Sequence, residues 1–336
     1  MTADMEPGVP ALPATTADSQ RAKRRRFRVQ SGRQLGTFAG LLGLSVVLWA
    51  ATPHFLTVSN LLNVLEQTSI NAIVAVGMTF VIISGGIDLS VGSVLALAGI
   101  ALASALEAGV PAPAAVALAL AAGLACGLGN GALITFGRLP PFIATLGMMS
   151  VARGAALMLA EGRPISGFSD GFRALATARV LMVPAPVIIT AVVYAVAHFV
   201  LARTVFGRAA YAIGGNEEAA RLSGVPVRFH KTAIYGVAGL TSGAAAVILT
   251  ARLNSAQPTA GMNYELDAIA ATVIGGTSLL GGEGTLIGAL IGALIMGVLR
   301  NGLNLLNVSS FFQQVVIGLV IIGAVLIDMS LKRRGR

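Results

Sequence analysis

Ten stretches of almost uninterrupted apolar sequence divide this chain. Each is close to the roughly 20 residues that a helix needs to cross a hydrocarbon core of about 30 Å. They lie at residues 35–52, 62–84, 89–107, 112–137, 141–161, 181–202, 232–252, 265–280, 285–300 and 310–328. Only 11% of the 336 residues are charged, against about a quarter in soluble domains. The sequence predicts an all-α polytopic membrane protein, a bundle of about ten transmembrane helices. An arrangement of eight spans, in which the short glycine-rich stretches are merged or do not cross the membrane, remains an alternative.

Basic residues cluster at the two ends of the chain, before the first apolar stretch and after the last. Basic flanks mark the cytoplasmic side of a membrane protein, so we expect both termini to be cytoplasmic. We therefore predict a disordered basic tail at 1–34, a transmembrane domain at 35–328 and a basic tail at 329–336. The formal charge of +9 is interpreted as topogenic charge with some attraction to anionic lipid, rather than as a nucleic-acid surface.

The chain shows no signature of a metal site, a cofactor or a catalytic centre. The one cysteine, Cys126, lies in an Ala/Gly/Leu run, and the three histidines lack metal-ligand spacing. No phosphate-binding G-x-x-x-x-G-K-[ST] loop occurs. If this protein uses ATP, a separate chain must bind it.

A polar turn at residues 84–93 interrupts the apolar sequence with the run Ser-Gly-Gly-Ile-Asp-Leu-Ser-Val-Gly-Ser. Its polar residues Asp88, Ser90 and Ser93 stand at the start of the next apolar stretch. We expect Asp88 and Ser90 to cap that helix, because side-chain oxygens there satisfy orphan amides. Irregular backbone at membrane depth survives only beside protein or water. The turn therefore either lines a conduction path or is a plain capped turn at the interface.

Other polar residues in or near the apolar stretches allow two interpretations. They line a path for a hydroxyl-rich solute, or they bond neighbouring helices together. Two are ionisable, Arg153 and Asp267, and such residues in a membrane have a functional role as the default hypothesis. An ion pair that fixes the bundle is the structural alternative. The residues predicted to line the path or gate it are Asn71, Asp88, Ser90, Ser93, Asn130, Phe142 and Asp267.

Residues 203–231 form the longest charged segment inside the apolar sequence. Within it, Asn216 is placed to cap a short helix that begins at Glu217 and Glu218. Gly224 and Pro226 then stop that helix. One face of the predicted helix carries small or apolar side chains and could fit into a groove of a partner. Its residues are Ala219, Ala220, Leu222 and Ser223. A solvated loop helix is the alternative, but connections of this length are uncommon without a role.

The run Glu218-Ala219-Ala220-Arg221-Leu222-Ser223-Gly224 matches the EAA-x-x-x-G pattern of permeases of ABC importers. The resemblance implies a cytoplasmic coupling helix that docks on an ATPase subunit. The Leu-Pro of the general importer branch is absent, since Gly236-Val237 occupy its place. The ATPase-coupling residues it implies are Arg208, Asn216, Glu217, Glu218, Ala219, Ala220, Arg221 and Gly224.

The wider sequence resembles the ribose-type branch of the sugar permeases over residues 60–328. Residues 86–92 (Gly-Ile-Asp-Leu-Ser-Val-Gly) and 212–216 (Ala-Ile-Gly-Gly-Asn) carry this resemblance most specifically. It implies a non-catalytic permease subunit of an ATP-driven importer in the bacterial inner membrane, which translocates a monosaccharide or related polyol by alternating access. A homodimer, a solute-binding protein and no cofactor are further implications. A branched-chain amino acid permease and a secondary transporter independent of ATP are the alternatives.

Overall fold

The computed structural model describes the backbone of residues 16–334 and the side chains of residues 34–326 and 329. Every predicted apolar stretch overlaps a helix of this structure. The ten helices are α1 (Thr16–Ala51), α2 (Val58–Ile83), α3 (Val91–Glu107), α4 (Ala112–Thr135), α5 (Pro141–Leu159), α7 (Ala185–Arg203), α10 (Val227–Leu253), α11 (Tyr264–Ile274), α12 (Leu286–Leu305) and α13 (Ser310–Arg334).

The prediction of an all-α polytopic membrane protein is confirmed. In the described part of the chain, seven helices are long and apolar enough to cross a membrane: the 34–51 part of α1, α2, α4, α5, α7, α10 and α12. Helix α3 and the apolar part of α13 are shorter. Helix α1 begins at Thr16, within the segment predicted as a disordered tail, because Ala, Arg, Lys and Gln all favour helix. Residues 1–15 and 335–336 of the predicted tails lie outside the described residues.

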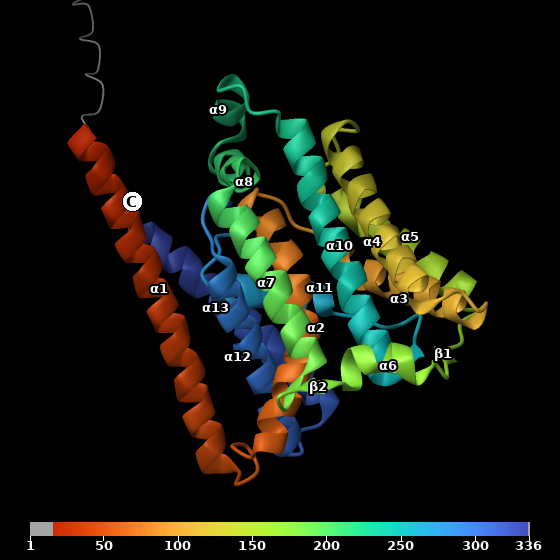
Figure 1. Ribbon diagram of the computed structural model, residues 1–336. Coiled ribbons are helices and arrows are strands. Elements are labelled where there is room, and N and C mark those ends of the chain that lie inside the picture. The colour runs from red at the N-terminus through yellow and green to blue at the C-terminus, as the bar shows by residue number, and fades with distance from the viewer. Residues whose placement is uncertain (1–15, 335–336) are drawn as a thin grey trace, which may run out of the picture.

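Successive helices run in alternating directions through the bundle (Figure 1). One end carries the short helices α8 (Val205–Gly215) and α9 (Glu217–Leu222), and is called here the α9 end. The opposite α6 end carries helix α6 (Asp170–Thr177) and four two-residue strands: β1 (Ile165–Ser166) pairs with β4 (Ser255–Ala256), and β2 (Arg179–Val180) pairs with β3 (Val183–Pro184). The described N-terminal part of α1 points to the α9 end (Figure 1).

Helices α2 and α10 form the centre of the bundle. In their most apolar windows, 83% and 72% of the residues are buried, against 22% for both α4 and α5. Helices α4 and α5 therefore lie at the periphery of this chain, where lipid or another subunit covers them.

Glycines bring the backbones of α4 and α10 into direct contact. Gly123, Gly127 and Gly131 recur every four residues on the face of α4 that meets α10. A Cβ atom at Gly123 would overlap the carbonyl oxygen of Gly239, and one at Gly127 would overlap that of Tyr235. In lipid, helices associate by close packing rather than by the hydrophobic effect, so small residues at the contact are decisive.

Non-helical segments inside the bundle interrupt the chain between two pairs of successive helices. The Gly-Asp turn, residues 84–90, separates α2 from α3, and the return segment, residues 254–263, separates α10 from α11. Helix α11 has 11 residues and so spans about 16 Å, half of a hydrocarbon core. Its last turn lies at the α9 end, because Gly282 just beyond it donates its N–H to the carbonyl of Ile83, the last residue of α2 (2.8 Å). The return segment therefore carries the chain from the α6 end to mid-depth.

The prediction that residues 265–280 form a full transmembrane span is wrong. The helix ends at Ile274, and residues 275–285 form a glycine-rich turn. Gly276, Gly281 and Gly282 have positive φ values of 91°, 83° and 73°, which L-residues adopt only with strain. Hydropathy alone cannot detect this break, because glycine does not lower the apolar average enough.

The two interruptions meet where the first turn of α3 touches the return segment. A Cβ atom at Gly92 would overlap the carbonyl oxygen of Gly261, and one at Gly261 would crowd the carbonyl oxygen of Gly92. Only glycine at both positions lets these backbones approach so closely.

The α4–α10 contact predicts a strong effect of side-chain volume at one glycine. Gly127→Leu should destabilise the protein by at least about 1–3 kcal/mol, the usual cost of overpacking, because the added side chain forces α4 away from α10. Gly147→Leu is the matched control, since no heavy atom lies within 4 Å of a Cβ at Gly147. The measurement is the melting temperature of each variant purified in detergent. Equal melting temperatures would contradict the contact.

Candidate functional site

The predicted cytoplasmic segment 203–231 folds into two helices rather than one. Thr204 caps α8 by accepting a hydrogen bond from the N–H of Gly207 (3.4 Å). Residue 216 then separates α8 from α9, and α10 begins at Val227. The sequence argument missed α8 because its glycines and alanines give no polar start signal beyond one threonine.

The caps of α9 are those that the sequence predicts. The Asn216 side chain accepts a hydrogen bond from the N–H of Ala219 (2.9 Å). At the other end, Gly224 has φ +82°, and the N–H of Val225 bonds the carbonyl of Ala220 (3.1 Å). This is the glycine-dependent pattern that ends many helices. The six-residue helix is therefore fixed at both termini.

The outward face of α9 differs from the predicted one at a single residue, Ala220. Ala220 is buried (4% exposed) and packs with Ile213 and Val227, so it anchors α9 and offers nothing to a partner. Leu222 is 78% exposed, and Glu218, Ala219, Arg221 and Ser223 are exposed beside it. Arg208 of α8 is exposed as well.

Two ion pairs order α9. Within the helix, Arg221 binds the carboxylate of Glu218, and these hydrogen bonds hold the pKa of Glu218 below its usual value. The second pair joins Glu217 to Lys231 of α10 (2.7 Å). The Lys231 side chain is only 11% exposed, so this bond ties α9 to the first turns of a central helix.

Helix α8 contacts the end of α2, next to the Gly-Asp turn, and the glycine-rich turn between α11 and α12. The Tyr211 hydroxyl donates to the carbonyl of Gly284 (2.8 Å) in the turn after α11, and burial raises the pKa of Tyr211 to about 12, so the donor stays protonated. A Cβ atom at Gly214 would overlap the carbonyl of Ile83 and crowd the amide of Gly282. Displacement of α8 therefore acts directly on the end of α2 and on the turn that leads to α12.

The Gly-Asp turn holds a buried polar cluster. Asp88 Oδ1 accepts from the backbone N–H of Ser90 (2.8 Å) and from its hydroxyl (2.6 Å). Asn130 of α4 donates to the same hydroxyl (2.8 Å), and its own Oδ1 has no partner among the described residues. Asp88, Ser90 and Asn130 are each at most 1% exposed.

The predicted capping of α3 by this turn is wrong. Ser90 occupies the N-cap position but makes no side-chain capping bond. The reason is that its hydroxyl is already taken by Asp88 on one side and Asn130 on the other. The turn therefore binds α4 to the start of α3 instead of closing the helix end.

A second polar cluster lies in the half of the bundle near the α6 end. Arg300 of α12 donates to both carboxylate oxygens of Asp267 on α11 (3.0 and 2.7 Å). Asn71 of α2 donates to the same carboxylate (3.3 Å). The Asp267 side chain is 3% exposed and that of Arg300 is 40% exposed. The sequence argument missed Arg300, although a basic residue at the end of an apolar stretch was the available signal.

Arg153 does not pair with Asp267, so the structural alternative of an ion pair between these two residues does not hold. Its guanidinium donates instead to the carbonyls of Pro258 (2.6 Å) and Ala260 (2.8 Å) in the return segment. Arg153 thus satisfies irregular backbone at depth, which must be hydrogen-bonded in a membrane.

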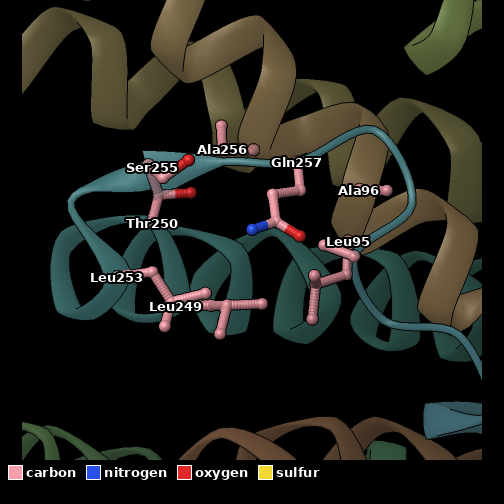
Figure 2. A pocket seen from close by; sticks show the side chains of 10 residues that line it. Leu95, Ala96, Leu249, Thr250, Leu253, Ser255, Ala256 and Gln257 are labelled. Atoms are coloured by element: carbon pink, nitrogen blue, oxygen red, sulfur yellow. The ribbon is translucent and has the colours of Figure 1, made fainter. Parts of the chain in front are cut away.

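A small cavity lies between α3, α10 and the return segment. Figure 2 shows Gln257 reaching over it, with Leu95 on one side and Leu249 on the other. About 10 Å³ is open to the centre of a water molecule, room for one water at most. This cavity is too small for an organic solute.

The predicted path residues thus fall into separate places. Asp88, Ser90 and Asn130 form the cluster of the Gly-Asp turn, while Asn71 and Asp267 belong to the Arg300 cluster. Ser93 is buried in the first turn of α3. Phe142, 51% exposed at the start of α5, belongs to neither cluster. In the part of the chain that the structure describes, no group of three or more His, Cys, Asp or Glu could hold a metal.

Comparison with known proteins adds the family. A family described as branched-chain amino acid transport system permease component matches residues 60–325. The chain is 50% identical over 298 residues to the ribose import permease protein RbsC of Bacillus subtilis, covering 88% of this chain and 92% of that protein. It is 51% identical to RbsC of Escherichia coli K12 over 292 residues (86% and 91%). It is also 40% identical to the D-allose transport system permease protein AlsC of Escherichia coli K12 over 300 residues (89% and 92%).

No solved structure matches the chain. The family match covers nearly all of the helical bundle, including both interruptions and the α8–α9 segment. The chain therefore belongs to the family of branched-chain amino acid transport system permease components and is a multi-pass membrane transport protein of that family.

Proposed function

We propose that this chain is the permease subunit of an ATP-driven ABC importer that carries a monosaccharide, ribose or a close relative, across the inner membrane. The single observation that carries the proposal is the 50% identity with a ribose import permease over 88% of the chain. The permeases named for D-allose and xylose are more distant, at 40% and 36% identity, which favours ribose among the three.

In this proposal the exposed faces of α8 and α9 dock on the ATPase subunit. The residues that would make or order this surface are those named from the sequence: Arg208, Asn216, Glu217, Glu218, Ala219, Ala220, Arg221 and Gly224. Leu222 joins them because an exposed apolar side chain on a short helix can insert into a partner's groove. Ala220 contributes by holding α9 in place rather than by contact.

Import then proceeds by alternating access. Closure of the ATPase would shift α8 and α9, and the contacts of Gly214 and Tyr211 would pass that motion to α2 and to the α11–α12 turn. The Glu217–Lys231 ion pair would pass it to α10. The Gly-Asp turn and the Asp267 cluster lie along these helices, which supports their place on the solute path.

Further parts of the assembly follow from the same proposal. A second copy of the chain would complete the path, a solute-binding protein would deliver the sugar at the α6 end, and lipid would surround the rest. With the α9 end on the ATPase side, both termini are cytoplasmic. The chain itself catalyses no covalent change, because ATP hydrolysis belongs to the partner.

Two alternative functions have less support. A branched-chain amino acid permease is suggested by the description of the family, but the ribose, D-allose and xylose permeases that the chain resembles at 36–51% identity are named for sugars. A secondary transporter needs a relay of ionisable groups across the membrane. The two fully buried carboxylates of the described residues, Asp88 and Asp267, lie in separate clusters, which disfavours such a relay.

Reconstitution tests the proposed function directly. Proteoliposomes that contain this chain, its ATPase and its binding protein should take up D-ribose only with ATP on the ATPase side. An uncoupler should not change the rate, because no ion gradient is used. Uptake of leucine in place of ribose would identify the amino acid alternative. Uptake that needs no ATP and collapses with the uncoupler would identify a secondary transporter.

The α9 surface predicts a site-specific loss of ATPase binding. Leu222→Asp should weaken ATPase association on the order of 10-fold or more, as loss of an interface anchor does. Leu181→Asp, at a leucine that is 93% exposed at the other end of the bundle, should leave association unchanged. Co-purification of the ATPase with each tagged variant measures this. Equal recovery in both variants would exclude α9 as the docking surface.

The contact between α8 and the end of α2 predicts a variant that still binds the ATPase but couples ATP hydrolysis poorly to uptake. Gly214→Ala places a methyl group against the carbonyl of Ile83, at a cost of about 1–3 kcal/mol if the backbones cannot part, so uptake per ATP hydrolysed should fall. Gly215→Ala is the matched control, because nothing lies within 4 Å of a Cβ there. Both variants should retain the ATPase. Normal coupling in Gly214→Ala would show that α8 does not transmit the motion.

A further inference from the structure

We propose that the half of the bundle near the α6 end carries a contact site for a neutral polyhydroxylated solute. The site consists of a polar stripe on α2, made by Asn63, Gln67 and Asn71, together with the Asp267–Arg300 pair that faces it. This inference rests on the proposed function and names where on the chain the solute binds in transit.

The polar stripe follows the periodicity of a helix. Its three residues are four positions apart and so lie on one face of α2, over about 12 Å of helix length. Asn63 is exposed near the α6 end, whereas Gln67 and Asn71 are partly buried deeper in the bundle. Gln67 donates to Asn63 (3.2 Å). The stripe is thus a row of amides leading from the end of the bundle toward its middle.

Cationic side chains from two other helices face this row. Arg252, near the end of α10, donates to Asn63 Oδ1 (3.3 Å). At the inner end, Asn71 donates to Asp267, which Arg300 binds through both carboxylate oxygens. Asn71 Oδ1 is buried and has no hydrogen-bond partner among the described residues, so it is an unsatisfied acceptor beside the pair.

The exposure of the pair shows what environment it faces. The Arg300 side chain is 40% exposed although α12 is an apolar helix. A charged group at membrane depth faces water or protein and not lipid, because its transfer into hydrocarbon is too costly. The open side of this cluster is therefore a water-filled space or an interface with a second subunit.

The chemistry of the site fits the hydroxyl groups of a sugar. Carboxylate, guanidinium and amide groups offer paired donors and acceptors, which match neighbouring hydroxyl groups of a sugar. The groups already satisfy most of one another's hydrogen bonds, so a solute would exchange bonds rather than gain many. Weak binding of this kind suits a solute that must leave again.

A nearby pair of amide side chains only joins two helices to each other. Asn60 of α2 and Asn301 of α12 each donate to the other's carbonyl oxygen (3.0 and 2.8 Å). They join the same two helices, one turn from Asn63 and next to Arg300. Because each amide is satisfied by the other, this pair is structural and serves as a control.

Cysteine accessibility tests the site without reference to the solute's identity. Asn63→Cys, Gln67→Cys and Asn71→Cys are made in a Cys126→Ala background, which removes the one native cysteine. Ile70→Cys is the control on the same helix, at a side chain that is 2% exposed. In the reconstituted complex, a charged methanethiosulfonate added on the α6 side should label the three stripe positions, fastest at 63, and should not label 70. Failure to label position 67, or equal labelling of position 70, would overturn the site.

Specificity tests contact with the solute itself. Arg300→Lys keeps the charge but removes the planar guanidinium, of which only Nη2 contacts Asp267. The ratio of D-ribose to D-allose uptake should therefore change by about 10-fold. The double variant Asn60→Ala/Asn301→Ala should keep the wild-type ratio, even if its melting temperature falls. An unchanged ratio in Arg300→Lys overturns the contact site while the wild-type complex still imports sugar. Absence of sugar uptake by the wild-type complex overturns the proposed function instead.

Discussion

Backbone amides and carbonyls at membrane depth must all be hydrogen-bonded, and the two interrupted helix pairs are where this chain meets that demand. An unbroken helix satisfies its own backbone, but the return segment cannot. Arg153 supplies two of the missing bonds, to Pro258 and Ala260. The glycine contact between residues 92 and 261 then shields the segment against α3. Because these interactions hold the return segment at mid-depth, helix α11 can begin there.

The position of α11 decides where the polar chemistry lies. Starting at mid-depth, it presents Asp267 to Asn71 of α2 and to Arg300 of α12, in the half of the bundle near the α6 end. Its other end reaches the turn that Tyr211 and Gly214 of α8 contact. One short helix thus connects the proposed solute site with the proposed ATPase surface. A movement at the proposed ATPase surface or at the proposed solute site can therefore be transmitted to the other through α11.

Sequence reasoning succeeded where local rules are sufficient. The cap by Asn216 and the stop at Gly224 depend on neighbours in the chain, and both are present. It failed where a distant segment competes for the same group. Ser90 caps nothing because Asn130, forty residues away, takes its hydroxyl. Arg153 binds carbonyls more than a hundred residues away, and Ala220 is buried by Ile213 and Val227 across a turn.

The sequence by itself determined the class of protein, the places of the apolar helices along the chain and the existence of the α9 helix, because hydropathy, periodicity and capping are properties of contiguous residues. It also contained the stripe of Asn63, Gln67 and Asn71 as a spacing of four. Only the tertiary structure decided that α11 is half a span, that Arg300 and not Arg153 neutralises Asp267, and which face of α9 is free. Those outcomes depend on which helices approach one another, and glycine-to-glycine contacts between distant segments set that approach.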